Sequence, residues 1–217
     1  EKIDNMEQAL ERAVANGVKQ LVVQPTHLMH GAEYDEMCAA IDKVRDQFDS
    51  VEIAEPMLGE VGDDATVINA DKEAVAKAVV AAALEESGYE TTAAAKDAGV
   101  AYVLMGHGTA HVAKVTYSQM ATQMAELGYE NVFVGTVEGE PEETSCEAVI
   151  EAVKNAGYTT VVLRPLMVVA GADDDSWKTM FEAAGFTVNC QISGLGRIAD
   201  VQALYVAHTK AAIDAIA

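Results

Sequence analysis

Short apolar runs alternate with longer amphipathic segments along the whole chain. In the second half, strands are predicted at about 100–106, 131–135, 159–164 and 186–192, and helices at about 114–127, 143–156, 175–184 and 197–216. In the first half, the same pattern predicts helices at about 4–16, 33–48 and 71–87, and strands at about 18–24 and 51–54. Gly128, Gly157 and Gly185 follow three of these helices, as is common at helix ends. Strands alternating with helices indicate an α/β fold with parallel sheets.

An internal repeat divides the chain into two related α/β halves. At an offset of 140 positions, six residues of the segment 16–35 match the segment 156–175: Gly17, Val22, Pro25, Gly31, Ala32 and Asp35. We therefore predict an N-terminal half at 1–98 and a C-terminal half at 99–217, with the last helix packing back on the first half. The first half lacks counterparts of two strands of the second, so we expect about 40–60 further residues upstream to belong to the fold.

Two predicted strands end in residues that bind metals. The apolar run 101–106 leads directly to His107, and the run 131–137 leads to Glu138. Parallel strands place the residues that follow them at one edge of the sheet, where α/β proteins carry their sites. A histidine alone at such a place is as readily a core or capping residue. With Glu138 arriving in the same way, a divalent-metal site is favoured.

Composition narrows the classes of function. Half of the residues are apolar and 6% are aromatic, which fits α/β layers, and the formal charge of −21 disfavours a nucleic-acid partner. No apolar run reaches the roughly 20 residues of a membrane span. Cys38, Cys146 and Cys190 are too widely spaced for a zinc knuckle. We expect a cytoplasmic protein, or an exported one if a signal segment preceded Glu1.

Four motifs resemble one known family. They are Met105-Gly-His-Gly-Thr-Ala-His111, Val137-Glu-Gly-Glu-Pro141, Leu163-Arg-Pro-Leu-Met167 and Gln24-Pro-Thr-His27. In this order they resemble the anaerobic sirohydrochlorin cobaltochelatases of the CbiK type, which are class II chelatases related to ferrochelatase. The resemblance covers nearly the whole chain. It implies two flavodoxin-like halves, with parallel sheets flanked by helices, that face each other across a tetrapyrrole cleft.

The resemblance also implies a ligand set for the metal. In the family a histidine of the HGT motif, a glutamate of the EG-x-P motif and a second histidine hold cobalt, and the first two correspond to His107 and Glu138. The second histidine has no counterpart here, because the segment near Ala172 runs directly into Asp173. This loop is about ten residues shorter than the family pattern. Either this protein has lost the ligand, or a segment is missing from the sequence at this point, and we expect the second.

Further residues are candidates for binding the tetrapyrrole or the metal. His27, Gly108, Thr109 and Arg164 are expected to line the tetrapyrrole cleft. The acidic chain must offer local cations or helix N-termini to a polycarboxylate ring, and the candidate cations are Lys114, Arg164, Lys178 and Arg197. Each of them is also compatible with an ordinary surface charge, which is the favoured interpretation for Lys178. The remaining candidates are His111 as an outer ligand or a structural residue, His30 near the cleft, His208 as a structural residue, and Asp173–Asp175 as a helix start.

The resemblance implies an enzyme that inserts Co²⁺, its substrate metal, into sirohydrochlorin without an organic cofactor. His107 would then bind the metal and accept pyrrole protons, since imidazole titrates near neutrality. A non-catalytic carrier of metal or tetrapyrrole is the alternative from another class. An iron chelatase that makes siroheme or heme is the nearest enzymatic alternative. A dinucleotide-dependent oxidoreductase is disfavoured because no GxGxxG motif follows a predicted strand. A homo-oligomer is the default expectation.

Overall fold

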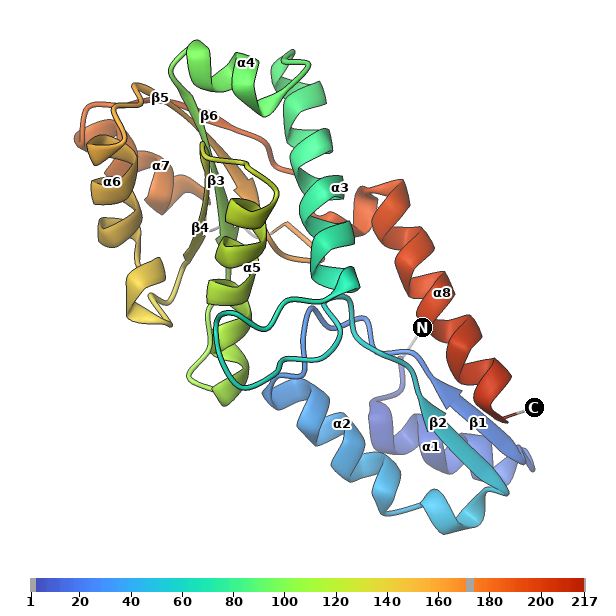
Figure 1. Cartoon of the computed structure of the whole chain (residues 1–217). Coiled ribbons are helices and arrows are strands. Elements are labelled where there is room, and N and C mark those ends of the chain that lie inside the picture. Colours follow the sequence, from blue (N-terminus) through green and yellow to red (C-terminus); the bar gives the residue numbers. More distant parts are fainter. Residues whose placement is uncertain (1–2, 171–173, 217) are drawn as a thin grey trace.

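The computed structural model describes residues 3–170 and 174–216, which form two parallel β-sheets flanked by helices (Figure 1). The first sheet pairs β1 (Gln20–Val23) with β2 (Ser50–Ile53). The second has the order β4-β3-β5-β6, formed by β3 (Val100–Gly106), β4 (Val132–Thr136), β5 (Thr160–Pro165) and β6 (Thr187–Cys190). All observed pairings are parallel. The predicted α/β class with parallel sheets is confirmed.

Helices connect the strands, close to the predicted positions. The long helices are α1 (Met6–Ala15), α2 (Ala32–Asp42), α3 (Ala70–Ser87), α5 (Val115–Glu126), α6 (Cys146–Asn155), α7 (Asp174–Ala183) and α8 (Ala199–Ile216). Short 3₁₀ turns lie at Arg45–Gln47, Val112–Lys114, Glu142–Thr144 and Leu195–Arg197. The helix α4 (Thr92–Asp97) was not predicted. Within the described residues, no helix is long and apolar enough to cross a membrane.

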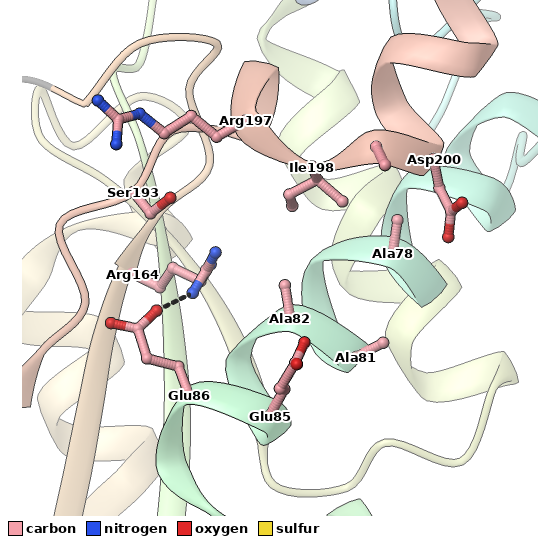
Figure 2. A pocket seen from close by; sticks show the side chains of 11 residues that line it. Ala78, Ala81, Ala82, Glu85, Glu86, Arg164, Ser193, Arg197, Ile198 and Asp200 are labelled. Atoms are coloured by element: carbon pink, nitrogen blue, oxygen red, sulfur yellow. Dashed lines mark hydrogen bonds and ion pairs between the residues drawn. The ribbon is translucent and has the colours of Figure 1, made fainter.

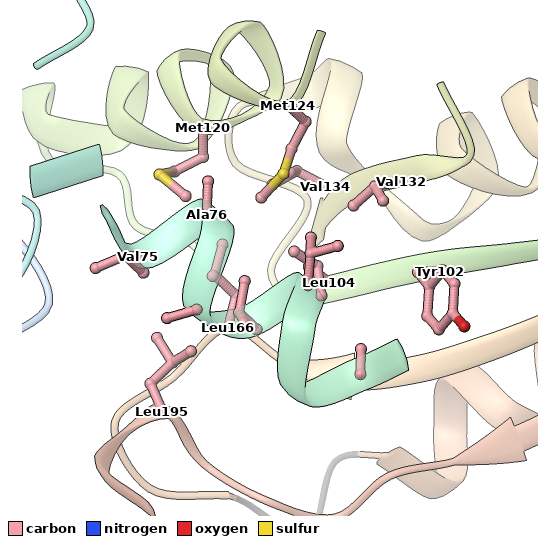
Figure 3. Packing of buried hydrophobic residues seen from close by; sticks show 14 of the residues in the cluster. Val75, Ala76, Tyr102, Leu104, Met120, Met124, Val132, Val134, Leu166 and Leu195 are labelled. Carbon is pink, nitrogen blue, oxygen red and sulfur yellow. The ribbon is translucent and has the colours of Figure 1, made fainter. Parts of the chain in front are cut away.

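Strand β3 forms the centre of the larger sheet and is buried along its whole length. Successive side chains of a strand point to opposite faces, so the core has two layers. Tyr102 and Leu104 face the layer of α3 and α5 (Figure 3), where they pack with Val75, Met120, Met124, Val132 and Val134. Ala101, Val103 and Met105 face the layer of α6 and α7, where they pack with Val149, Trp177 and Phe181. This double coverage explains the uninterrupted apolar run in the sequence.

Each sheet is covered by one helix from the opposite half of the sequence. Helix α3 precedes the predicted boundary at residue 98, yet its apolar residues belong to the core of the four-stranded sheet. Helix α8 packs on β1 and β2 and lies beside α3 (Figure 1). By sequence α3 belongs to the first half, but by packing it belongs with the four-stranded sheet of the second half. The Tyr205 hydroxyl on α8 donates to the carbonyls of Thr26 and His27 at 3.1 Å each, which anchors the loop after β1.

Candidate functional site

His107 and Glu138 lie beside each other at the carboxyl ends of β3 and β4. The two strands pair up to Gly106 and Thr136, and the loops continue the pairing, because Glu138 N–H donates to the His107 carbonyl at 2.9 Å. His107 Nδ1 is 3.6 Å from Glu138 Oε1, and the two side chains are 60% and 50% exposed. The predicted proximity of these side chains is confirmed. Their roles as metal ligands stay a prediction.

The contacts of His107 orient its ring. Nδ1 lies 3.2 Å from the Gly108 carbonyl and near the Glu138 carboxylate, and both of these groups only accept hydrogen bonds. Nδ1 must therefore carry the proton if it bonds to either of them. In the neutral ring, Nε2 then has the free lone pair, and within the described residues Nε2 makes no hydrogen bond. This nitrogen is available to bind a metal or accept a proton.

Gly108 allows the two loops to approach closely. Its φ of +92° lies in a region that side chains disfavour. A Cβ at this position would lie 3.0 Å from Glu138 Cβ and 3.2 Å from Thr136 Cβ. The HGT motif therefore needs glycine here for both conformation and space.

A cavity of about 360 Å³ opens beside the pair. It is lined by the loop after β1, the starts of α2 and α5, and the loops after β3 and β4. The lining residues are His27, Leu28, Met29, Gly31, Glu33, His107, Gly108, Thr109, Tyr117 and Glu138. The candidates His27, Gly108 and Thr109 thus share one cavity with His107 and Glu138. His27 Nδ1 is buried and has no hydrogen-bond partner within the described residues.

The sequence analysis missed Glu33 and Tyr117, which line the same cavity. Glu33 lies in the first turn of α2, shortly after β1 ends. The segment after β1 occupies a strand end in the first half, as His107 does in the second. This correspondence could have identified Glu33. Tyr117 carried no signal in the sequence, because its position depends on how α5 packs beneath β3.

A neighbouring pocket of about 690 Å³ contains His30 and His111, together with Asp35, Glu55, Glu60 and Asp63. His111 Nε2 is 3.2 Å from Asp35 Oδ2, and its Nδ1 accepts the Ala113 N–H at 3.2 Å. His30 Nε2 is 2.9 Å from Glu55 Oε2, and its ring stacks on Tyr34. His111 therefore has both ring nitrogens engaged and joins the two halves of the chain.

Arg164 does not line the cavity of His107, and its assignment to the tetrapyrrole cleft stays a prediction. It pairs with Leu104 in the sheet register, so its side chain points to the face covered by α3. Its side chain is 3% exposed, and its guanidinium donates to Glu86 at 2.9 Å and to Gln191 at 2.8 Å. Figure 2 shows it in a separate pocket of about 520 Å³, which Arg197 also lines.

The other candidate cations are paired or distant. Lys114 Nζ is 2.7 Å from Glu140 Oε2, near the entrance of the EG-x-P loop. Lys178 forms an ion pair with Glu182 one turn along α7, which agrees with the surface-charge interpretation. His208 contacts the Glu55 carbonyl and Asp71, both at 3.1 Å, and so links α8 to α3.

The predicted gap in the ligand set near Ala172 lies outside the described residues, as does Asp173. Within the part of the chain that the structure describes, no three His, Cys, Asp or Glu side chains are grouped closely enough to hold an ion. The described part of the site is therefore a pair of potential ligands. An open pair of this kind leaves coordination positions for exchange.

Two α/β halves with parallel sheets line one cavity, into which the larger sheet presents a histidine and a carboxylate, and this arrangement fits the α/β chelatase class. The chain belongs to the cobalt chelatase (CbiK) family, whose model matches residues 1–214. The family resemblance seen in the four sequence motifs is thus confirmed.

Individual relatives agree with the family. The chain is 28% identical to the sirohydrochlorin cobaltochelatase of Salmonella typhimurium over 221 residues, covering 98% of this chain and 75% of that protein. It is 26% identical to the sirohydrochlorin cobaltochelatase CbiKC of Nitratidesulfovibrio vulgaris over 226 residues, covering 99% and 73%.

Solved structures show the same fold at lower identity. SirB from Bacillus subtilis with Fe³⁺ superposes with a TM-score of 0.70 at 16% identity, covering 99% of this chain and 80% of that one. The SirB sirohydrochlorin chelatase of Bacillus subtilis subspecies spizizenii in complex with cobalt gives 0.58 at 15% identity, covering 99% and 78%. At these low sequence identities, the two comparisons show only that this chain has the same fold.

Proposed function

We propose that this protein is a chelatase that inserts Co²⁺ into sirohydrochlorin. The observation that carries the proposal is the pair His107 and Glu138, 3.6 Å apart and open to one cavity, in a chain of the cobalt chelatase family. Co²⁺ is the substrate metal, and no organic cofactor is needed because no electron is transferred. A homo-oligomer and a cytoplasmic location stay predictions.

Metal insertion requires the ring to lose two pyrrole protons while the ion leaves its protein ligands. His107 would hold the ion through Nε2, whose lone pair is free while Nδ1 bonds to Gly108 and faces Glu138. Once the ion has left, the same lone pair can accept one pyrrole proton, and the Glu138 carboxylate or solvent can accept the second. Glu138 would supply negative charge to the ion through a carboxylate that is half exposed. The ion can then leave, because a pair of open ligands does not enclose it.

The cavity walls suit a flat ring with acidic substituents. Leu28 and Met29 offer apolar surface to a ring face, and His27 offers a buried nitrogen without a described partner. Helix α2 begins at this wall, and its N-cap residue Gly31 has no side chain to cap the first N–H groups. Those N–H groups and the positive end of the helix dipole favour a carboxylate. The first turn of α2 also carries Glu33 and Asp35, so a substituent of the ring would compete with these carboxylates for the N–H groups.

The test is the absorbance change of metal-free sirohydrochlorin under anaerobic conditions, with and without the protein. We expect Co²⁺ insertion to exceed the uncatalysed rate in a manner proportional to protein concentration. A carrier would bind ring and metal without any acceleration, and that outcome would remove the enzyme assignment. Faster insertion of Fe²⁺ than of Co²⁺ at equal concentration would favour the iron chelatase, because His and Glu ligands suit both ions.

A further inference from the structure

Tyr117 lies directly beneath the loop that carries His107. It belongs to the first turn of α5 and is buried, with only 3% of its surface exposed. Its ring packs against Gly106, the last residue of β3, where any Cβ would overlap the ring. The absence of a side chain at Gly106 therefore leaves the space in which the Tyr117 ring lies against the start of the His107 loop.

The hydroxyl of Tyr117 holds the main chain of the HGT motif. Its oxygen accepts the Gly108 N–H at 3.2 Å, one residue beyond His107. Near pH 7 the phenol is neutral, because a tyrosine ordinarily titrates near pH 10. A neutral phenol can accept this N–H while keeping its own proton.

The position of this hydrogen bond affects how the His107 ring lies relative to the Glu138 carboxylate. Gly108 follows His107 and lies against Glu138, with its φ at +92°. Its carbonyl contacts His107 Nδ1, while its N–H contacts Tyr117. Gly108 therefore contacts both groups, and through it the tyrosine affects the orientation of the His107 imidazole ring.

We propose that Tyr117 is a positioning residue for metal insertion, which fixes the His107 ring against Glu138 through its hydrogen bond to Gly108. The proposal rests on the proposed function. It assigns no contact between Tyr117 and the metal.

The test compares Tyr117→Phe with Tyr102→Phe. Both substitutions remove one buried phenol hydroxyl and keep the ring. The Tyr102 hydroxyl bonds to Ser87 Oγ at 3.0 Å and lies toward the other end of β3. The two variants should lose similar stability, which thermal unfolding measures, so a general weakening of the core affects both.

We expect kcat for Co²⁺ insertion to fall about ten- to a hundredfold in Tyr117→Phe, because a small misplacement of a reacting group costs rates of this order. KM for sirohydrochlorin should change less than about twofold, since the ring is bound by other residues. Tyr102→Phe should keep the wild-type kcat. Equal kcat values in the two variants, or a change of Tyr117→Phe in KM alone, would overturn the proposal.

A second measurement separates this proposal from the proposed function. Equilibrium dialysis of Co²⁺ with the ring-free protein should give a Kd about tenfold weaker for Tyr117→Phe than for Tyr102→Phe, since pre-organised ligands bind more tightly. If wild-type protein never accelerates insertion, the proposed function is wrong, while this comparison still decides the positioning role. Equal Kd values would overturn that role.

Discussion

Lys72 is a buried lysine in the first turn of α3, and its replacement by methionine has a pH-dependent effect that the structure defines. The side chain has no exposed surface, and Nζ donates to the carbonyl of Leu58 at 3.0 Å and to that of Glu60. Burial lowers the pKa of this amine from 10.5 to about 8, although Asp71 and other carboxylates oppose the change. Lys72→Met keeps the length of the side chain and removes the charge.

The sign follows from proton binding. Between pH 8 and 10.5 the unfolded chain still binds the lysine proton, whereas the folded chain has released it. Rising pH therefore stabilises wild type relative to Lys72→Met over this range, and falling pH through about 8 removes that contribution. The pKa interval from 10.5 to about 8, at about 1.4 kcal/mol for each pH unit, sets an upper limit of about 3–4 kcal/mol on this difference in unfolding free energy.

Urea unfolding of both proteins between pH 7 and pH 10 measures this difference. Lys77→Met is the matched control, because Lys77 lies on the same helix, is 54% exposed and pairs with Glu73. We expect the unfolding free energy of wild type minus Lys72→Met to rise with pH, and the corresponding difference for Lys77→Met to stay nearly flat. A difference for Lys72→Met that stays flat or falls would refute the reasoning.

Three further substitutions test other parts of the account. Gly108→Ala should lower turnover at least about tenfold, because its Cβ would crowd Glu138 at 3.0 Å from a strained φ; wild-type turnover would contradict the tight approach. Glu138→Gln should weaken Co²⁺ binding, measured by dialysis, more than sirohydrochlorin binding, and the opposite order would remove Glu138 from the metal site. Arg164→Met should keep turnover near wild type but destabilise the fold by about 1–2 kcal/mol in urea, since Gln191 and Glu86 lose a donor. A large loss of turnover at normal stability would instead indicate that Arg164 binds the substrate.

The sequence predicted the elements that are buried on both faces. The strand at 100–106 was predicted within its observed bounds because its apolar run is continuous, and His107 follows it without an intervening loop. The proximity of Glu138 followed from parallel pairing alone. These features depend on local pattern and on the regular geometry of a sheet.

Features that depend on packing between distant parts of the chain could not be predicted from the sequence. Arg164 was assigned to the cleft from its place near a strand end, but the side-chain direction follows the pleat, which points it toward α3. Nothing in the sequence distinguishes Lys72 from the other lysines, and only the fold places its Nζ within hydrogen-bonding distance of the Leu58 and Glu60 carbonyls. The packing of α3 in the core of the larger sheet likewise depends on contacts with the other half of the chain.

The most direct test of the central claim is the rate of Co²⁺ insertion by His107→Ala, with binding of sirohydrochlorin measured separately by absorbance titration. His30→Ala is the matched control, because His30 also pairs with a carboxylate but lines the neighbouring pocket. We predict that His107→Ala loses at least about 10²-fold in rate, the lower range of general acid–base catalysis, while its affinity for the ring stays within a few-fold of wild type. His30→Ala should keep most of the rate. A near wild-type insertion rate for His107→Ala would contradict the claim that this histidine binds the metal and accepts a pyrrole proton.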